Sequence, residues 1–519
     1  MPTITIDGKK LEFEQGQSII EVAHDNEMKI PHYCYHPSLS VVANCRICLA
    51  EVWAPNPRNE NKLEPMPKLL PTCQTQASEG QVVYTTSPKA TANQKAVMEM
   101  LLNHHPIDCP TCDQAGECDL QDYAYEYGRG ERRSDIEKIT QSKKDIGDNI
   151  MLYGDRCIMC TLCVRFTDEI SGTSELFIDG RGVNECIDVF PGIGINNELS
   201  GNVIDICPVG AMLDKHFMFQ QSVWFLKSVP SIDPLTSSGD NITVEFNNNK
   251  VYRIKPRTNL DINEYWITDE VRYGWNFVHD ETRVTKLNED AEMISGDILQ
   301  QATSIALLVS PMISCEDAWL LGQLVRGIDA DAILGIGPVP IVGEDKTFKS
   351  GFTMRCEKAP NVRGVQRALG NVLDYEAWKQ QVSKADTVVV TGNYPEAWET
   401  PEITDNQTLI LIDTLANGLT ERANVFIPAA TWAEKSGTFE NYNNKLQLFE
   451  QAIQPLGDSQ AEGQVAMNLQ ALVDDMETTV FNAATVRRRM ADAGIAGMLD
   501  VELPKKTTHV ETDMPMFEV

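Results

Sequence analysis

The sequence predicts an α+β fold of several domains, and three observations carry this prediction. Alternating polar and apolar residues over 3–14 indicate a β-hairpin with an Asp-Gly turn. Twelve of the 14 cysteines lie between residues 34 and 207, at spacings typical of metal-cluster loops. Short apolar runs alternate with helical segments between residues 305 and 429, as in parallel strands joined by crossover helices. At 519 residues the chain is also too long for one core.

The amino-terminal segment predicts a β-grasp domain around the first cysteine group. Residues 18–26 have helical spacing with a capping serine, and the strand QVVYTT closes the domain near residue 85. A lone cysteine, a C-x2-C pair and a distant fourth cysteine form the pattern of a ferredoxin-type 2Fe-2S site. The first group consists of Cys34, Cys45, Cys48 and Cys73. Its first interval is longer than in plant-type ferredoxins, but four ligands remain.

The second group follows a predicted helix over residues 88–104 and includes a histidine. Prolines and a glycine within HPIDCPTCDQAGEC favour a loop that wraps around a cluster. Four ligands, one of them an imidazole, fit a 4Fe-4S cluster. The second group consists of His105, Cys109, Cys112 and Cys118. His104 is an alternative ligand, although the H-x3-C spacing favours His105.

The third group repeats the C-x2-C-x2-C spacing of bacterial 4Fe-4S proteins and adds a distant Cys-Pro. It consists of Cys157, Cys160, Cys163 and Cys207. A single 4Fe-4S cluster is the simpler interpretation, because the Cys-Pro comes too late for an interleaved pair of clusters. Cys186 fits none of the groups, and we expect it to be a buried core thiol.

Other uses of cysteine are less consistent with this pattern. Structural zinc sites also contain C-x2-C pairs, so one group alone would leave zinc open. Three successive groups of four ligands favour iron–sulfur chemistry. The amino terminus leads directly into strand residues, so we expect no targeting peptide and a reducing, cytosolic environment without disulfides.

Charge and hydropathy narrow the possible partners. Asp and Glu number 75 against 44 Lys and Arg, which gives a formal net charge of −31. Such an acidic chain argues against binding to nucleic acid or anionic lipid, although a merely solvated acidic surface explains the charge equally well. No run of eighteen apolar residues is present, so we expect no membrane span.

The remainder of the chain predicts two further domains. Residues 241–254 form a clear hairpin with an Asn-rich turn inside a small β domain. An α/β domain follows, and its strands are expected at 305–310, 386–392, 408–413 and 424–429. A helical arginine-rich piece and a polar tail at 507–519 end the chain. The predicted domains are residues 1–85, 86–148, 149–222, 223–285 and 286–519.

The joint order of the three groups resembles the large iron–sulfur subunits of respiratory complex I, a family known by its 75 kDa member. The stretch ANVFIPAATWAEKSGTFEN also looks like a molybdopterin oxidoreductase signature, and the resemblance covers about residues 1–450. It implies that the α/β part is a truncated relic for packing against partners, in which Gly392, Gly437 and Thr438 once faced a cofactor. No molybdopterin is expected, because the molybdopterin-like part is short. Cys315 and Cys356 are the remaining thiol candidates for a molybdenum ligand, and we expect neither to serve as one.

The resemblance further implies one 2Fe-2S and two 4Fe-4S clusters. Some family members carry another 4Fe-4S site, which we expect to be missing because residues 208–314 contain no cysteine. The implied function is single-electron transfer from a flavin subunit toward quinone, on the cytoplasmic side of the membrane in a peripheral arm. The alternatives are a subunit of a hydrogenase or of a formate dehydrogenase, and a zinc scaffold without redox function.

Overall fold

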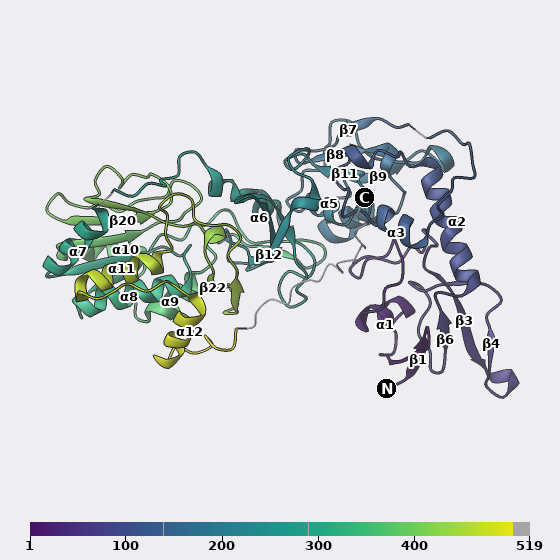
Figure 1. Cartoon of the computed structure of the whole chain (residues 1–519), viewed down its shortest axis with the longest axis horizontal. Helices are drawn as coiled ribbons and strands as arrows, with labels where there is room; N and C mark the ends of the chain where they lie inside the picture. Colours follow the sequence, from purple (N-terminus) through teal and green to yellow (C-terminus); the bar gives the residue numbers. More distant parts are fainter. Residues whose placement is uncertain (139, 289, 502–519) are drawn as a thin grey trace, which may run out of the picture. The chain divides into compact units, whose positions relative to one another are not determined.

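The computed structural model describes residues 1–138, 140–288 and 290–501, which fold as two units (Figure 1). The amino-terminal unit contains residues 1–225 together with 348–352, and the carboxy-terminal unit contains the other described residues. No helix in these ranges is both long and apolar enough to cross a membrane. The predicted polar tail at 507–519 lies outside the described residues.

The amino-terminal unit begins with a β-grasp arrangement, as predicted. Its strand order is β2-β1-β6-β3-β4, with β5 paired to β3. Ser18 and Glu21 form a capping box that starts the predicted helix α1. Apolar side chains such as Ile4, Ile19 and Val83 fill the core between helix and sheet. The elements are β1 (Thr3–Ile6), β2 (Lys9–Glu12), α1 (Ile19–Asp25), β3 (Leu49–Asn56), β4 (Lys62–Pro65), β5 (Leu70–Pro71) and β6 (Val82–Tyr84).

The rest of this unit consists of helices and small sheets that carry the cluster loops. The helix predicted over residues 88–104 is confirmed as α2, which starts at the cap Ser87 with Pro88 in its first turn. Strands β7, β8 and β11 form one small sheet, and β9 and β10 form another. The elements are α2 (Pro88–His104), α3 (Asp119–Tyr127), β7 (Lys143–Asp145), β8 (Ile150–Tyr153), α4 (Leu162–Phe166), β9 (Leu176–Asp179), β10 (Cys186–Val189), α5 (Asn202–Asp205) and β11 (Met212–Asp214).

The carboxy-terminal unit opens with a three-stranded antiparallel sheet, β12 (Lys227–Ile232), β13 (Asn241–Asn247) and β14 (Lys250–Pro256), followed by α6 (Asp269–Tyr273). The predicted Asn-rich turn is confirmed, since Asn248 and Asn249 have φ of 47° and 62°. This sheet shares its core with aromatic residues such as Phe439 and Phe449 from the hairpin β22 (Gly437–Glu440) and β23 (Leu446–Phe449).

A five-stranded parallel sheet of order β16-β15-β19-β20-β21 forms the centre of the α/β region. It confirms the four predicted strands and adds β16. Helices cover both faces, because alternate residues of β15 enter two separate apolar cores. The elements are α7 (Ala291–Gln301), β15 (Ile305–Val309), α8 (Cys315–Ile328), β16 (Ile333–Ile336), β17 (Lys346–Thr347), β18 (Thr353–Met354), α9 (Val362–Leu369), α10 (Tyr375–Gln381), β19 (Thr387–Thr391), β20 (Thr408–Asp413), β21 (Val425–Pro428), α11 (Glu462–Asp474) and α12 (Ala483–Asp492).

Candidate metal centres

The first cysteine group gathers at one end of the β-grasp sheet. Strand β5 pairs with the start of β3, with Leu49 opposite Pro71, and this pairing brings Cys48 beside Cys73. Their sulfur atoms are 3.7 Å apart. Cys34, Cys48 and Cys73 are between 1% and 3% exposed, so three of the four predicted ligands are shielded from water.

The four thiols of this group perturb one another strongly. Hydrogen bonds from the Cys34 and Cys48 thiols lower the pKa of the Cys45 thiol. The same interactions raise the pKa of Cys34 and of Cys48. A buried cluster of sulfurs cannot carry several negative charges without a compensating cation. The donor set therefore fits a thiophilic polycationic group such as 2Fe-2S.

His105 lies at the carboxyl end of α2, where its backbone N–H bonds to the Leu101 carbonyl at 3.0 Å. Its Nδ1 atom is buried without a hydrogen-bond partner. Burial lowers the pKa of His105, which favours the neutral imidazole that binds metal. His104, by contrast, is exposed. These observations favour His105 over its neighbour as the ligand.

The three cysteines of the second group lie on the loop between α2 and α3. Cys118 is the residue that caps α3, and burial raises the pKa of its thiol to about 12. Cys112 lies against Gly210, where a Cβ atom would come within 2.3 Å of its sulfur. The absence of a side chain at Gly210 therefore lets the return segment of the third group close over the second.

The third group is assembled by pairing of β11 with β8, in which Met212 lies opposite Leu152. This pairing returns Cys207 to the loop that follows β8. Burial, and then the nearby Cys207 thiol, raise the pKa of Cys157 to about 12. The Met159 N–H donates to the Cys157 sulfur at 3.4 Å, and Met159 adopts a left-handed φ of 52°. The loop thus turns backbone donors toward sulfur, as cluster loops do.

The loop of the third group contacts the loop of the first group. The Asn44 side-chain amide donates to the Met159 carbonyl at 3.2 Å. The Ser40 N–H donates to the Glu169 carboxylate at 2.8 Å. Both donors belong to the long interval between Cys34 and Cys45, so this departure from simple ferredoxins forms a docking edge within the unit.

A buried arginine connects the third group to the second. Arg156 is 2% exposed and lies directly before Cys157. Its guanidinium contacts the Asp108 carboxylate at 2.6 Å and donates to the Gly210 carbonyl at 3.3 Å. The loop of the third group therefore contacts both of the other groups. Sequence reasoning missed Arg156, whose one signal was its position beside a cluster cysteine.

The expectation that Cys186 is a buried core thiol was wrong. Cys186 is half-buried on β10, opposite Asp179. Strands β9 and β10 form a sheet of only two strands, so they leave this side chain partly open to solvent.

The three residues proposed to have once faced a cofactor are packed against the protein itself. A Cβ atom at Gly392 would come within 1.8 Å of the Asp413 carboxylate, and one at Gly437 within 2.5 Å of Ser314. The Thr438 hydroxyl donates to Glu316 at 2.7 Å. These residues thus allow close packing at the carboxyl-end edge of the parallel sheet.

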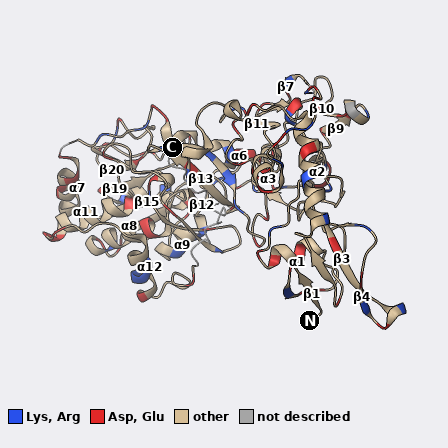
Figure 2. Ribbon diagram, turned by 45° about the vertical axis from the view of Figure 1, so that its right-hand side comes forward, with Lys and Arg blue, Asp and Glu red and all other residues tan. Residues whose placement is uncertain are grey.

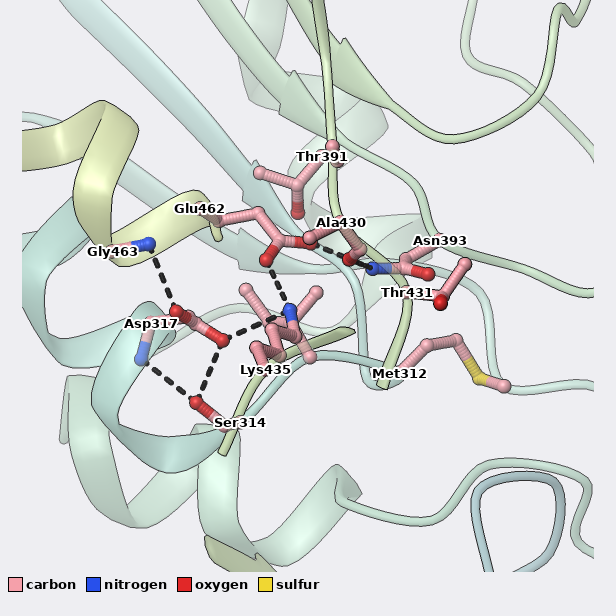
Figure 3. Close-up of polar contacts among 12 residues, drawn as sticks. Met312, Ser314, Asp317, Thr391, Asn393, Ala430, Thr431, Lys435, Glu462 and Gly463 are labelled. Atoms are coloured by element: carbon pink, nitrogen blue, oxygen red, sulfur yellow. Dashed lines mark hydrogen bonds and ion pairs between the residues drawn. The ribbon is translucent and has the colours of Figure 1, made fainter. Parts of the chain in front are cut away.

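A buried polar network covers the same edge (Figure 3). Lys435 pairs with Asp317 at 3.0 Å and also with Glu462. Glu462 accepts from the Asn393 amide at 2.8 Å, and Asp317 accepts from the Gly463 N–H at 2.9 Å. Ligands of α/β folds bind at such edges, and here the protein's own side chains satisfy one another.

The two remaining cysteines lie apart from the three groups. Cys315 is fully buried at the start of α8, where its thiol contacts the Asn361 side chain at 3.5 Å. Cys356 is half-buried, and its N–H donates to Asp345 at 2.8 Å.

Five family models match successive stretches of the chain. Residues 1–88 match a 2Fe-2S iron-sulfur cluster binding domain, and residues 94–133 match the NADH-ubiquinone oxidoreductase-G iron-sulfur binding region. Residues 147–213 match the ferredoxin-like domain of NADH-quinone oxidoreductase subunit 3. Residues 226–276 match the NDSU1/NuoG-like 4Fe-4S domain, although they contain no cysteine. Residues 379–471 match molybdopterin oxidoreductase, so that domain is present in part.

Curated relatives agree with these matches. The chain is 33% identical to the 78 kDa subunit of mitochondrial NADH-ubiquinone oxidoreductase from Candida albicans, over 76% of this chain and 52% of the relative. It is 36% identical to the mitochondrial NADH dehydrogenase (ubiquinone) iron-sulfur protein 1 of Solanum tuberosum, over 64% of this chain and 44% of the relative. The chain thus spans about half, or less, of these relatives. A crystal structure of an NAD+-reducing [NiFe]-hydrogenase matches 42% of this chain and 90% of its own at 28% identity, with a TM-score of 0.37.

Together the fold, the cysteine groups and the family models are those of a protein built from iron–sulfur cluster binding domains. More particularly, the chain is homologous to the large iron–sulfur subunit of respiratory complex I, the NADH-quinone oxidoreductase.

Proposed function

We propose that this chain is the iron–sulfur electron-transfer subunit of an NADH:quinone oxidoreductase. The observation that carries the proposal is that the three groups of predicted ligands lie in one unit, in which the loop of the third group contacts the loops of the other two. Iron–sulfur clusters supply one-electron chemistry when bound. The first group would hold a 2Fe-2S cluster, and the second and third would each hold a 4Fe-4S cluster, through the twelve side chains named above.

The residues of this chain would bind the clusters, shield them from water and position them. The cysteines supply charge-compensating thiolates, and backbone N–H groups directed at sulfur tune the potential. Hydride carries two electrons, so a flavin on a partner subunit would split the pair before single electrons reach this chain. The partners would be that flavin subunit and other hydrophilic subunits, in a peripheral arm on the cytoplasmic side of the membrane.

Elemental analysis of the anaerobically purified chain tests this proposal directly. We expect about ten iron atoms per chain, because 2Fe-2S contributes two and each 4Fe-4S four. We expect no molybdenum and no stoichiometric zinc. Molybdenum near one atom per chain would favour a formate dehydrogenase type of oxidoreductase, and zinc in place of iron would overturn the redox function.

A pair of cysteine variants makes the analysis site-specific. Cys163→Ser removes a buried ligand of the third group and should lower the iron content by up to about four atoms. Cys186→Ser changes a thiol outside the groups and should leave the iron content unchanged. Equal losses in both variants would contradict the proposed assignment.

A further inference from the structure

Arg165 joins the loop of the first cysteine group to the loop of the third. It lies on α4, two residues after Cys163, and is 8% exposed. One guanidinium nitrogen donates to the Cys34 carbonyl at 2.7 Å and to the Cys160 carbonyl at 3.3 Å. The other terminal nitrogen donates to the Ser40 carbonyl. A single cation thus bonds to the backbone of a ligand from the first group and a ligand from the third.

The acceptors of Arg165 are neutral. Its Nε donates to the Thr161 hydroxyl at 3.3 Å, and its terminal nitrogens donate to carbonyl oxygens. The other arginine of this loop, Arg156, instead pairs with the Asp108 carboxylate. The charge of Arg165 is therefore less compensated by its hydrogen-bond partners, and burial weakens its screening by water.

We propose that Arg165 is a positioning residue that raises the reduction potentials of the first and third clusters together. This inference rests on the proposed function. Reduction adds one negative charge to a cluster, and a nearby buried cation stabilises that charge. The planar fork of arginine also fixes the Cys34 and Cys160 backbones relative to each other, which a flexible ammonium cannot do equally well.

The test is a redox titration of the full-length chain with its clusters, followed by electron paramagnetic resonance. Arg165→Met should shift the ratio of reduced to oxidised protein about tenfold toward the oxidised form at the first and third clusters, or about 59 mV for a one-electron couple. The second cluster should keep its potential. Arg165→Lys retains the charge, so the potentials of the first and third clusters should stay much closer to those of the unmodified chain.

Two matched variants serve as controls. Arg133→Met removes an exposed arginine of the same unit that pairs with Glu99, and it should leave all three potentials unchanged. Arg156→Met should affect the second cluster, which lies beside its partner Asp108, in contrast to Arg165→Met.

The outcomes separate this inference from the proposed function. Absence of reducible clusters in the unmodified chain would overturn the proposed function itself. Unchanged potentials in Arg165→Met, with the clusters present, would overturn the role of Arg165 alone. Loss of the first and third clusters in both Arg165→Met and Arg165→Lys would show that the guanidinium only holds the loops, and would also overturn it.

Discussion

At the scale of single residues, the choice of donor atom has the largest consequence at His105. A neutral imidazole brings no charge to its cluster, whereas each cysteine brings one negative charge as a thiolate. The buried, unpartnered Nδ1 atom of His105 provides a donor directed away from solvent. With the proposed ligands, the second centre would therefore differ from the third in ligand charge while having the same number of ligands.

His105→Cys should therefore lower the reduction potential of the second cluster, because it adds a negative charge that disfavours the reduced state. We expect about a tenfold or greater change in the redox equilibrium, with the other two clusters unaffected. A redox titration monitored by paramagnetic resonance measures this shift. His104→Gln changes the exposed neighbouring histidine and should leave the reduction potential of the second cluster unchanged. A shifted potential in that variant would indicate that His104, and not His105, is the ligand.

Residue types and spacings were sufficient to nominate twelve donors, because cluster chemistry restricts both. The same reasoning could not find Arg156 and Arg165, because their acceptors are mainly backbone carbonyls and a carboxylate far away in the chain. A charged residue near a cluster cysteine is not unusual in a sequence. Only the fold shows that Arg156 and Arg165 are buried.

At the scale of elements, capping residues and periodicity predicted α1, α2 and four of the parallel strands. Strand β16 was missed because Gly335 interrupts an already short apolar run, and a glycine inside a strand weakens the pattern. The structure explains that glycine: a Cβ atom would come within 2.3 Å of the Trp378 ring. Gly335 is therefore required by the packing of α10 on the sheet, although in the local sequence a glycine suggests that the strand is interrupted.

The buried network around Lys435 gives a prediction for the α/β region. Lys435→Met would leave the Asp317 and Glu462 carboxylates buried without their shared cation, and we expect a loss of roughly 3–5 kcal/mol in the free energy of unfolding. Urea unfolding followed by near-ultraviolet circular dichroism measures this loss.

Lys445→Met provides the matched control for that change. Lys445 pairs with Asp261 at 3.2 Å at an exposed site, and an exposed pair contributes only about 0–1 kcal/mol. Comparable losses in the two variants would contradict the importance of the buried network.

At the scale of the whole molecule, the two units have separate cores. The three cysteine groups belong to the amino-terminal unit, while the parallel sheet and its two cores belong to the other. Figure 2 shows acidic and basic residues on both units. Sequence could predict the order of segments, but not that the small sheet β12–β14 shares its core with the α/β region, because that depends on packing between distant residues.

Thermal unfolding should consequently show two transitions. Removal of iron by a chelator under reducing conditions should lower the midpoint of the amino-terminal transition, because bound metal stabilises the folded form of the unit that binds it. The other transition should stay within a few degrees. Calorimetry combined with hydrogen exchange assigns the transitions, and an equal fall in both would contradict independent units.

The approach of Gly210 to the Cys112 sulfur also has a consequence for maturation. All four donors of the second site are synthesised by residue 118, yet the backbone that covers Cys112 arrives only with Gly210. With a cluster bound as proposed, we therefore expect the second site to be covered only after the segment that follows Cys207 has folded back.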